Sequence, residues 1–119
     1  MTADYVLRIA CPADRMATLS RIVGAEPTRS SHGYWSFEVS ERATEGPVPF
    51  VDIFLGLLKG KYDLLAEVGI ARRHVSVWIY CEYSDQCNLQ LLAKDLRRLG
   101  EEQIDLCISC WQTEDPQEA

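Results

Sequence analysis

Strict alternation of hydrophobic and polar residues predicts four β-strands, over residues 4–11, 34–40, 73–83 and 103–111. The alternation is clearest in the third segment. There Val75, Val77 and Ile79 share one face, while Trp78 and Tyr80 share the other. Each strand therefore has one face suited to a hydrophobic core, and the third strand also presents large aromatic side chains on its opposite face.

Between these strands, hydrophobic residues recur every three or four positions, which predicts helices over residues 12–24, over residues 50–68 and in a last segment that ends at Gly100. Gly60 is expected to break the middle segment into two short helices, since glycine weakens a helix by about 1 kcal/mol relative to alanine. The start of the last helix has two interpretations: Asp85 caps it, or residues 86–91 extend the third strand. Residues 25–33 and 41–49 are expected to be polar loops.

The order of these elements is β-α-β, a helical insert, and β-α-β again, which predicts an α+β fold. Two similar halves favour a four-stranded antiparallel, ferredoxin-like (split βαβ) sheet with helices on one face and the helical insert between strands 2 and 3. A chain of 119 residues has the usual size of one domain. We therefore expect a single α+β domain over residues 1–112 and an acidic, disordered tail over residues 113–119.

The formal net charge of −6 is carried by the end of the chain. All twelve basic residues and twelve of the eighteen acidic residues lie within residues 1–100, which are therefore neutral overall. The remaining acidic residues are Glu101, Glu102, Asp105, Glu114, Asp115 and Glu118. An acidic end repels the phosphate backbone, which argues against a nucleic-acid-binding protein.

The sequence predicts neither a membrane span nor a secretory signal. Its longest hydrophobic run, residues 53–58, is much shorter than the ~20 residues that a membrane-spanning helix needs. Asp4 and Arg8 interrupt any hydrophobic signal segment at the N-terminus. Five cysteines without regular spacing suit reduced thiols. We therefore expect a cytoplasmic protein that does not contact a membrane.

Several short segments give the chain a resemblance to a known family: residues 24–28, Trp35, Cys87 to Leu89, Leu99 with Gly100, and Ile108 to Cys110. Together they resemble the small bacterial proteins catalogued as domain of unknown function 4279. The resemblance spans nearly the whole chain. It implies a bacterial α+β domain with no established activity, so it transfers no catalytic residue to this sequence.

The cysteines do not predict a metal or redox site. Cys107 and Cys110 have the spacing of half a zinc site, but residues three apart in a strand point to opposite faces. Cys87 would be the most reactive thiol if it lay at a helix N-terminus, yet neither His32 nor His74 forms a local motif with it. We therefore expect no catalytic residue, no metal and no cofactor.

The aromatic residues are the most informative candidates for a functional surface. Trp78, Tyr80 and Trp111 are expected on one sheet face together with Asp105. Helices cover only one face of a two-layer α+β sheet, so this second face must meet the helices of residues 50–68, a second subunit or a partner protein. Tryptophan and tyrosine are enriched at protein interfaces.

Three classes of function follow from these observations. The first is a non-enzymatic binding protein that uses this sheet face or the acidic end, in its concrete form an immunity protein that neutralises a basic toxin, or a homodimer. The alternative is a small-molecule sensor with its ligand near the 25–34 loop, where Arg29, His32 and Trp35 are the candidate contacts. The third is an enzyme that uses Cys87 or His32, for which the sequence offers the least support.

Overall fold

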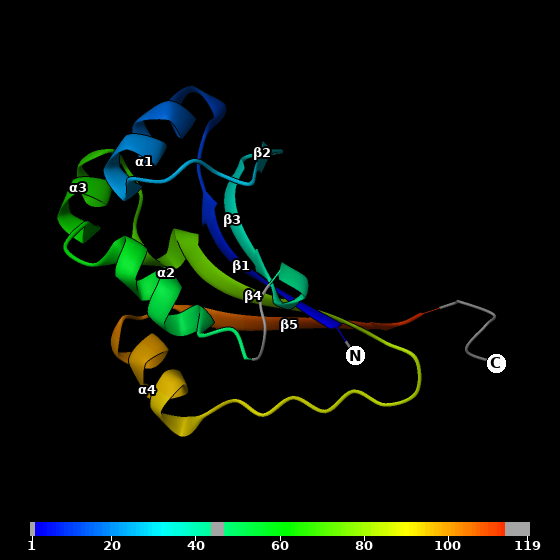
Figure 1. The fold of residues 1–119 in the computed structure, drawn as a ribbon. Coiled ribbons are helices and arrows are strands. Elements are labelled where there is room, and N and C mark those ends of the chain that lie inside the picture. The colour runs from blue at the N-terminus through cyan, green and yellow to red at the C-terminus, as the bar shows by residue number, and fades with distance from the viewer. Residues whose placement is uncertain (1, 44–46, 114–119) are drawn as a thin grey trace.

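Five strands of the described chain form one mixed sheet, in the order β2-β3-β1-β4-β5 (Figure 1). The computed structural model describes residues 2–43 and 47–113. The central strand β1 pairs antiparallel with both β3 and β4, and β4 pairs in parallel with β5. The strand bounds are β1 (Thr2–Ala10), β2 (Arg29–Ser31), β3 (Tyr34–Ser40), β4 (Val75–Tyr83) and β5 (Asp105–Gln112).

The α+β class is confirmed, but the sheet is not the four-stranded antiparallel, ferredoxin-like sheet that the element order predicts. The extra strand, β2, lies in the segment expected to be a loop. A loop is expected there because the sequence Arg-Ser-Ser has no hydrophobic alternation. It forms a hairpin with β3, which inserts between β2 and β1. At the other edge, α4 connects β4 to β5, and the two strands run in the same direction. Because no strand lies between them, they form a parallel pair.

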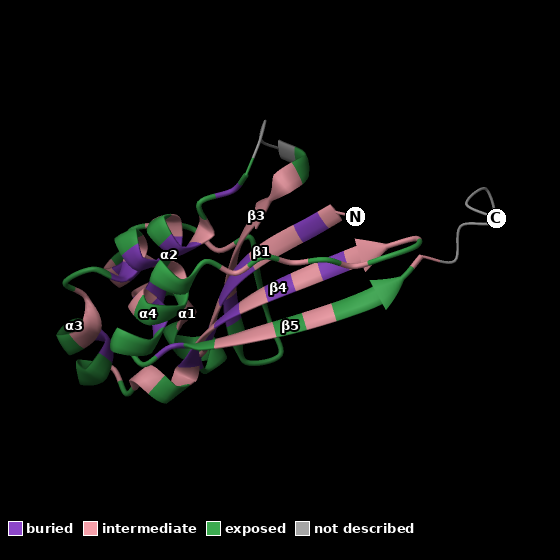
Figure 2. Cartoon of the chain, turned by 90° about the horizontal axis from the view of Figure 1, so that it is seen from below, coloured by how far each residue is buried: buried purple, intermediate pink, exposed green. Residues whose placement is uncertain are grey.

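All four described α-helices cover the same face of the sheet, which we call the inner face (Figures 1 and 2). They are α1 (Met16–Val23), α2 (Phe50–Leu58), α3 (Tyr62–Glu67) and α4 (Ala93–Glu101). The inserted helices α2 and α3 therefore do not cover the opposite, outer face. The longest described helices have nine residues, and none is long and apolar enough to cross a bilayer.

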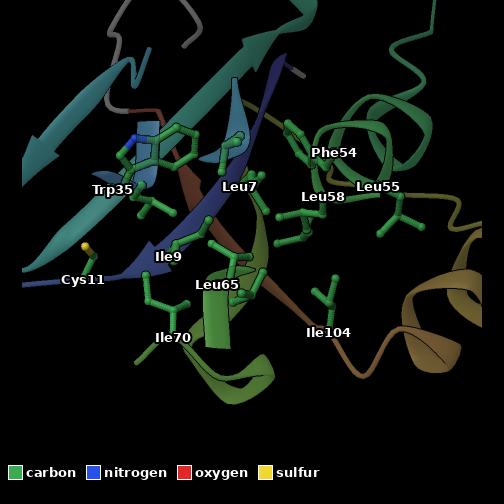
Figure 3. Close-up of a cluster of buried hydrophobic side chains, with 14 of the residues drawn as sticks. Leu7, Ile9, Cys11, Trp35, Phe54, Leu55, Leu58, Leu65, Ile70 and Ile104 are labelled. Atoms are coloured by element: carbon green, nitrogen blue, oxygen red, sulfur yellow. The ribbon is translucent and has the colours of Figure 1, made fainter. Parts of the chain in front are cut away.

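The hydrophobic core lies between the inner face and the helices (Figure 3). Leu7 and Ile9 of β1 and Val77 of β4 are completely buried against Phe54 and Leu58 of α2. Complete burial of each such side chain contributes about 1.5–3 kcal/mol. This core sets the phase of each strand, since residues on either side of an inward-facing residue must face outward.

The helix ends follow the glycines in part. Gly24 ends α1 in a left-handed conformation with φ of 80°, and Gly60, with φ of 73°, separates α2 from α3 as expected. Neither interpretation of the last helix is right: residues 84–92 form neither helix nor strand, and α4 begins only at Ala93. Of the expected tail, Thr113 donates its backbone N–H to the Tyr83 carbonyl, and residues 114–119 lie outside the described chain.

We expect Ile79→Ala to lower the free energy of unfolding by about 2–5 kcal/mol, because truncating this completely buried side chain leaves a cavity. Arg73→Ala is the control, since Arg73 is exposed and its truncation should cost less than ~0.5 kcal/mol. Arg72 is unsuited to this purpose because its guanidinium lies 3.5 Å from the centre of the Tyr62 ring. Denaturant unfolding measures both variants, and equal midpoints would contradict the inward position of Ile79.

Candidate functional site

Arg8 occupies the middle of the outer face, held between aromatic side chains from neighbouring strands. Its guanidinium carbon lies 5.0 Å from the centre of the Tyr34 ring and 4.6 Å from that of Trp78. It also donates a hydrogen bond to the Tyr80 hydroxyl. The Trp78 and Tyr80 rings stack on each other, with centres 5.7 Å apart. These contacts fix the position of a positive charge on a face that no described helix covers.

The positive charge of Arg8 is not balanced by a carboxylate. Within residues 2–43 and 47–113, no carboxylate lies within 4.0 Å of the guanidinium of Arg8 or of Arg29. The Arg8 Nε–H is buried and has no hydrogen-bond acceptor among the described residues. A half-buried guanidinium normally has such partners, since leaving a buried donor unsatisfied costs about 1–3 kcal/mol. Among the described residues, the Arg8 guanidinium therefore has no direct carboxylate partner.

Arg8 belongs to a row of residues that crosses three strands. Ser36 of β3 pairs with Arg8 of β1 on one side and with Arg29 of β2 on the other. Neighbouring strands lie about 4.8 Å apart, so the row places two arginines on either side of one serine hydroxyl. Asp4 lies four residues from Arg8 along β1, a distance of about 13 Å at 3.3 Å per residue. Glu38 lies nearer, two residues from Ser36 along β3, but among the described residues it forms no ion pair with either arginine.

A shallow pocket of about 350 Å³ connects these groups. Its lining combines the two arginines with two carboxylates, two aromatic rings and small side chains: Asp4, Val6, Arg8, Arg29, Ser36, Glu38, Tyr80 and Trp111. The pocket lies on the outer face, because every lining residue of β1, β3 and β4 alternates along its strand with the residues that face the core. It suits a polar group that carries charge.

The candidate interface residues do not all lie together. Trp78 and Tyr80 stack in the centre of the face, and Trp111, which is 46% exposed, lines the pocket beside Tyr80. Asp105 is exposed at the opposite end of β5, six residues from Trp111 and therefore about 20 Å away.

Two of the six acidic residues at the end of the chain lie beside arginines within the described residues. Glu101 pairs with Arg97 on α4, and Glu102 lies beside Arg72. Glu114, Asp115 and Glu118 lie outside the described residues.

The structure separates the three candidate residues of the 25–34 loop. Arg29 lines the pocket from β2, whereas His32 lies exposed in the turn between β2 and β3, with φ of 53°. Trp35 is completely buried in the core (Figure 3). Its indole N–H donates a hydrogen bond to the Ser20 hydroxyl, 3.0 Å away. Its indole is therefore part of the core and is not accessible to a ligand.

Three cysteines meet on the inner face, in a cluster that their spacing along the sequence does not indicate. Cys81 of β4 and Cys110 of β5 are register partners, and Cys87 reaches them from residues 84–92. The three Sγ atoms all lie within 4.8 Å of one another, and those of Cys87 and Cys110 are 3.6 Å apart. Cys107 lies on the outer face beside Trp78, on the side away from Cys110. The shared parity of Cys81 and Cys110 was visible in the sequence, but their adjacency required the strand order.

Neither Cys81 nor Cys87 shows the lowered pKa that activates a cysteine nucleophile. Burial, with a further contribution from the neighbouring Cys110, raises the pKa of Cys81 to about 12. The pKa of Cys87 is also raised, first by desolvation and then by its interaction with Cys110. This is opposite to the effect of a helix N-terminus, and α4 begins six residues after Cys87. His74 precedes β4 at the end opposite to Cys81 and accepts a hydrogen bond from the Ala71 N–H.

No protein-family model, curated protein or solved structure matches the chain. The resemblance to domain of unknown function 4279 therefore stays a prediction, as do the bacterial origin and the cytoplasmic location. The outer face and the cysteine cluster are the two places from which a function can be inferred.

We expect alkylation of the native protein to modify Cys107 and Cys110 first, because Cys11 and Cys81 are only 3% and 0% exposed and the pKa of the partly exposed Cys87 is raised. Burial also raises the pKa of both buried thiols, which lowers the reactive thiolate fraction. After unfolding without reductant, all five cysteines should be modified, as mass spectrometry can count. A count of three would reveal a disulfide in a chain whose cysteines we expect to be reduced.

Proposed function

We propose that the protein is a non-enzymatic binding protein whose recognition surface is the outer face of the sheet, and that this face pairs with a second copy of the chain. The observation that carries the proposal is the uncompensated Arg8 guanidinium, fixed among aromatic rings on a face that no described helix covers. Binding to a surface of this kind is favourable when the partner covers the rings and supplies the missing carboxylate.

The residue types of the outer face support protein binding. Tryptophan, tyrosine and arginine are the residues that most often dominate the energy of an interface. Here Trp78, Tyr80 and Arg8 are already stacked and hydrogen-bonded in the single chain. Because their positions are fixed before binding, little conformational entropy is lost when a partner covers them.

The charges of the face support a second copy as the partner. Across a two-fold axis, a residue that lies away from the axis is opposite a different residue of the other copy, and each such pair occurs twice. A face with cations at Arg8 and Arg29 and anions at Asp4 and Glu38 can therefore complement itself. A face with one sign of charge would instead repel its copy.

The size of the face is sufficient for a stable pair. The two central strands have nine residues each, so the sheet is about 30 Å long at 3.3 Å per residue. Four spacings of about 4.8 Å make it about 19 Å wide, which gives about 600 Å² in projection. The accessible surface exceeds the projection, and specific interfaces bury about 800 Å² on each partner.

A small charged molecule is the second candidate ligand, and the pocket supports it. A volume of about 350 Å³ lies at the lower end of the ~300–1,000 Å³ typical of ligand sites. Arg29, predicted as a loop contact, lines this pocket together with Arg8, whereas His32 and Trp35 do not. A ligand with a carboxylate is expected, and free glutamate is a suitable probe. Recognition of a basic toxin by the acidic end stays a prediction.

The self-pairing proposal can be tested by exchanging charges. We expect Arg29→Glu and Glu38→Lys each to weaken dimerisation at least ~10-fold, because like charges then face each other across the two-fold axis. A mixture of the two variants should form a heterodimer of nearly native affinity, since each altered charge then meets its opposite. Sedimentation equilibrium of each variant and of the mixture measures the three dissociation constants.

Arg73→Glu is the matched control, because Arg73 is exposed but lies outside the outer face, in the turn before β4. Its dimerisation should equal that of the native protein. A native protein that stays monomeric, or a mixture that does not recover affinity, would contradict self-pairing. A monomer that glutamate stabilises in the native protein but not in Arg29→Glu would establish the second candidate instead.

A further inference from the structure

The cysteine cluster brings together sulfur atoms from three separate segments of the chain. Cys81 and Cys110 lie side by side on β4 and β5, and Cys87 closes the group from residues 84–92. This last segment is anchored near the cluster, because Leu89 and Leu91 pack against the buried group that contains Ile79 and Cys81. Its start is held by the Gln112 side-chain amide, which donates to the Ser84 carbonyl 3.0 Å away. The three sulfur atoms are therefore positioned by structure that does not depend on a ligand.

The separations between the sulfur atoms match those around one metal ion. A metal–sulfur bond of about 2.3 Å places two sulfur ligands about 3.8 Å apart in a tetrahedral site and about 4.0 Å apart in a trigonal one. The Sγ atoms of Cys87 and Cys110 are 3.6 Å apart, and the other two sulfur pairs are separated by at most 4.8 Å, so all three separations are compatible with these values. Shifts of well under 1 Å would make the three distances equal.

We infer that Cys81, Cys87 and Cys110 bind one thiophilic metal ion, copper(I), in three-coordinate geometry. Sulfur ligands select soft cations such as copper(I) and zinc, and structural zinc sites almost always have four protein ligands. Among the described histidine, cysteine, aspartate and glutamate residues, the group contains only these three cysteines. Neither histidine lies near it, since His32 is in the β2–β3 turn and His74 is at the other end of β4.

Binding replaces three protons with one cation. Each thiol releases its proton to solvent as its sulfur–copper bond forms, and no change of oxidation state is involved. Cys81 is completely buried, so its thiolate is stable there only beside a positive charge. Cys110 is exposed, which gives the ion a path from solvent to the cluster.

The test is an anaerobic titration of the reduced, full chain with copper(I) in the presence of the competing chelator bathocuproine disulfonate. We expect uptake of one copper(I) per chain, with a near-ultraviolet thiolate-to-copper absorption band and a rise in melting temperature. Cys87→Ser and Cys110→Ser, which alter partly or fully exposed positions, should each weaken binding more than ~10-fold.

Cys107→Ser is the matched control, because it removes a cysteine of β5 that faces away from the cluster. It should bind copper(I) as the native protein does, and far-ultraviolet circular dichroism should show that all three variants are folded. Unchanged uptake in both Cys87→Ser and Cys110→Ser would overturn the inference. So would loss of uptake in Cys107→Ser, or tighter binding of zinc(II) than of copper(I) in a parallel titration.

Discussion

The rest of the structure depends on the constraint that every crossover connection returns on the same face of the sheet. The connection from β1 through α1 reaches β2, which runs parallel to β1 and lies two positions to one side. The strands β3, β4 and β5 all run opposite to β1. The connections from β3 to β4 and from β4 to β5 therefore join parallel strands, and each moves across the sheet in the direction opposite to the first connection. When the strand direction and the direction of movement across the sheet are both reversed, a connection of the same handedness lies on the same face of the sheet. Connections of one handedness therefore place all the helices on one face.

This constraint leaves the outer face without a covering layer, so its side chains must be stable in contact with water. The chain meets the requirement by combining aromatic rings with charged and hydroxyl groups instead of building a second hydrophobic core. Val6 is the exception: it is 6% exposed although it faces outward, because its register partners Trp78 and Glu38 lie on either side of it. Arg8 is similarly sheltered by rings. The side chains of this face are held in fixed positions but stay accessible from solvent, as recognition of a partner requires.

Alternation in the sequence was sufficient to predict β1, β3 and β4 and the outward position of Trp78, because burial of one face imposes a period of two. It was insufficient for β2, whose three polar residues are all exposed and held in place by pairing with β3. The parity of Trp35 with Phe37 and Val39 already indicated the core, although its neighbours in the loop favoured a binding role. The cysteine cluster required the pairing of β4 with β5 and the path of residues 84–92, neither of which has a periodic signal.

The parallel pairing of β4 with β5 also has a consequence for synthesis on the ribosome. The segment that forms β5 is the last described element of the chain to be made, and β4 is its partner in the sheet. Until it emerges, the side chains of Ala3, Ile79 and Cys81 lack the cover that Leu106 supplies. A nascent chain stalled before residue 105 therefore exposes both this hydrophobic surface and the unpaired edge of β4, the two features that chaperones and neighbouring chains recognise.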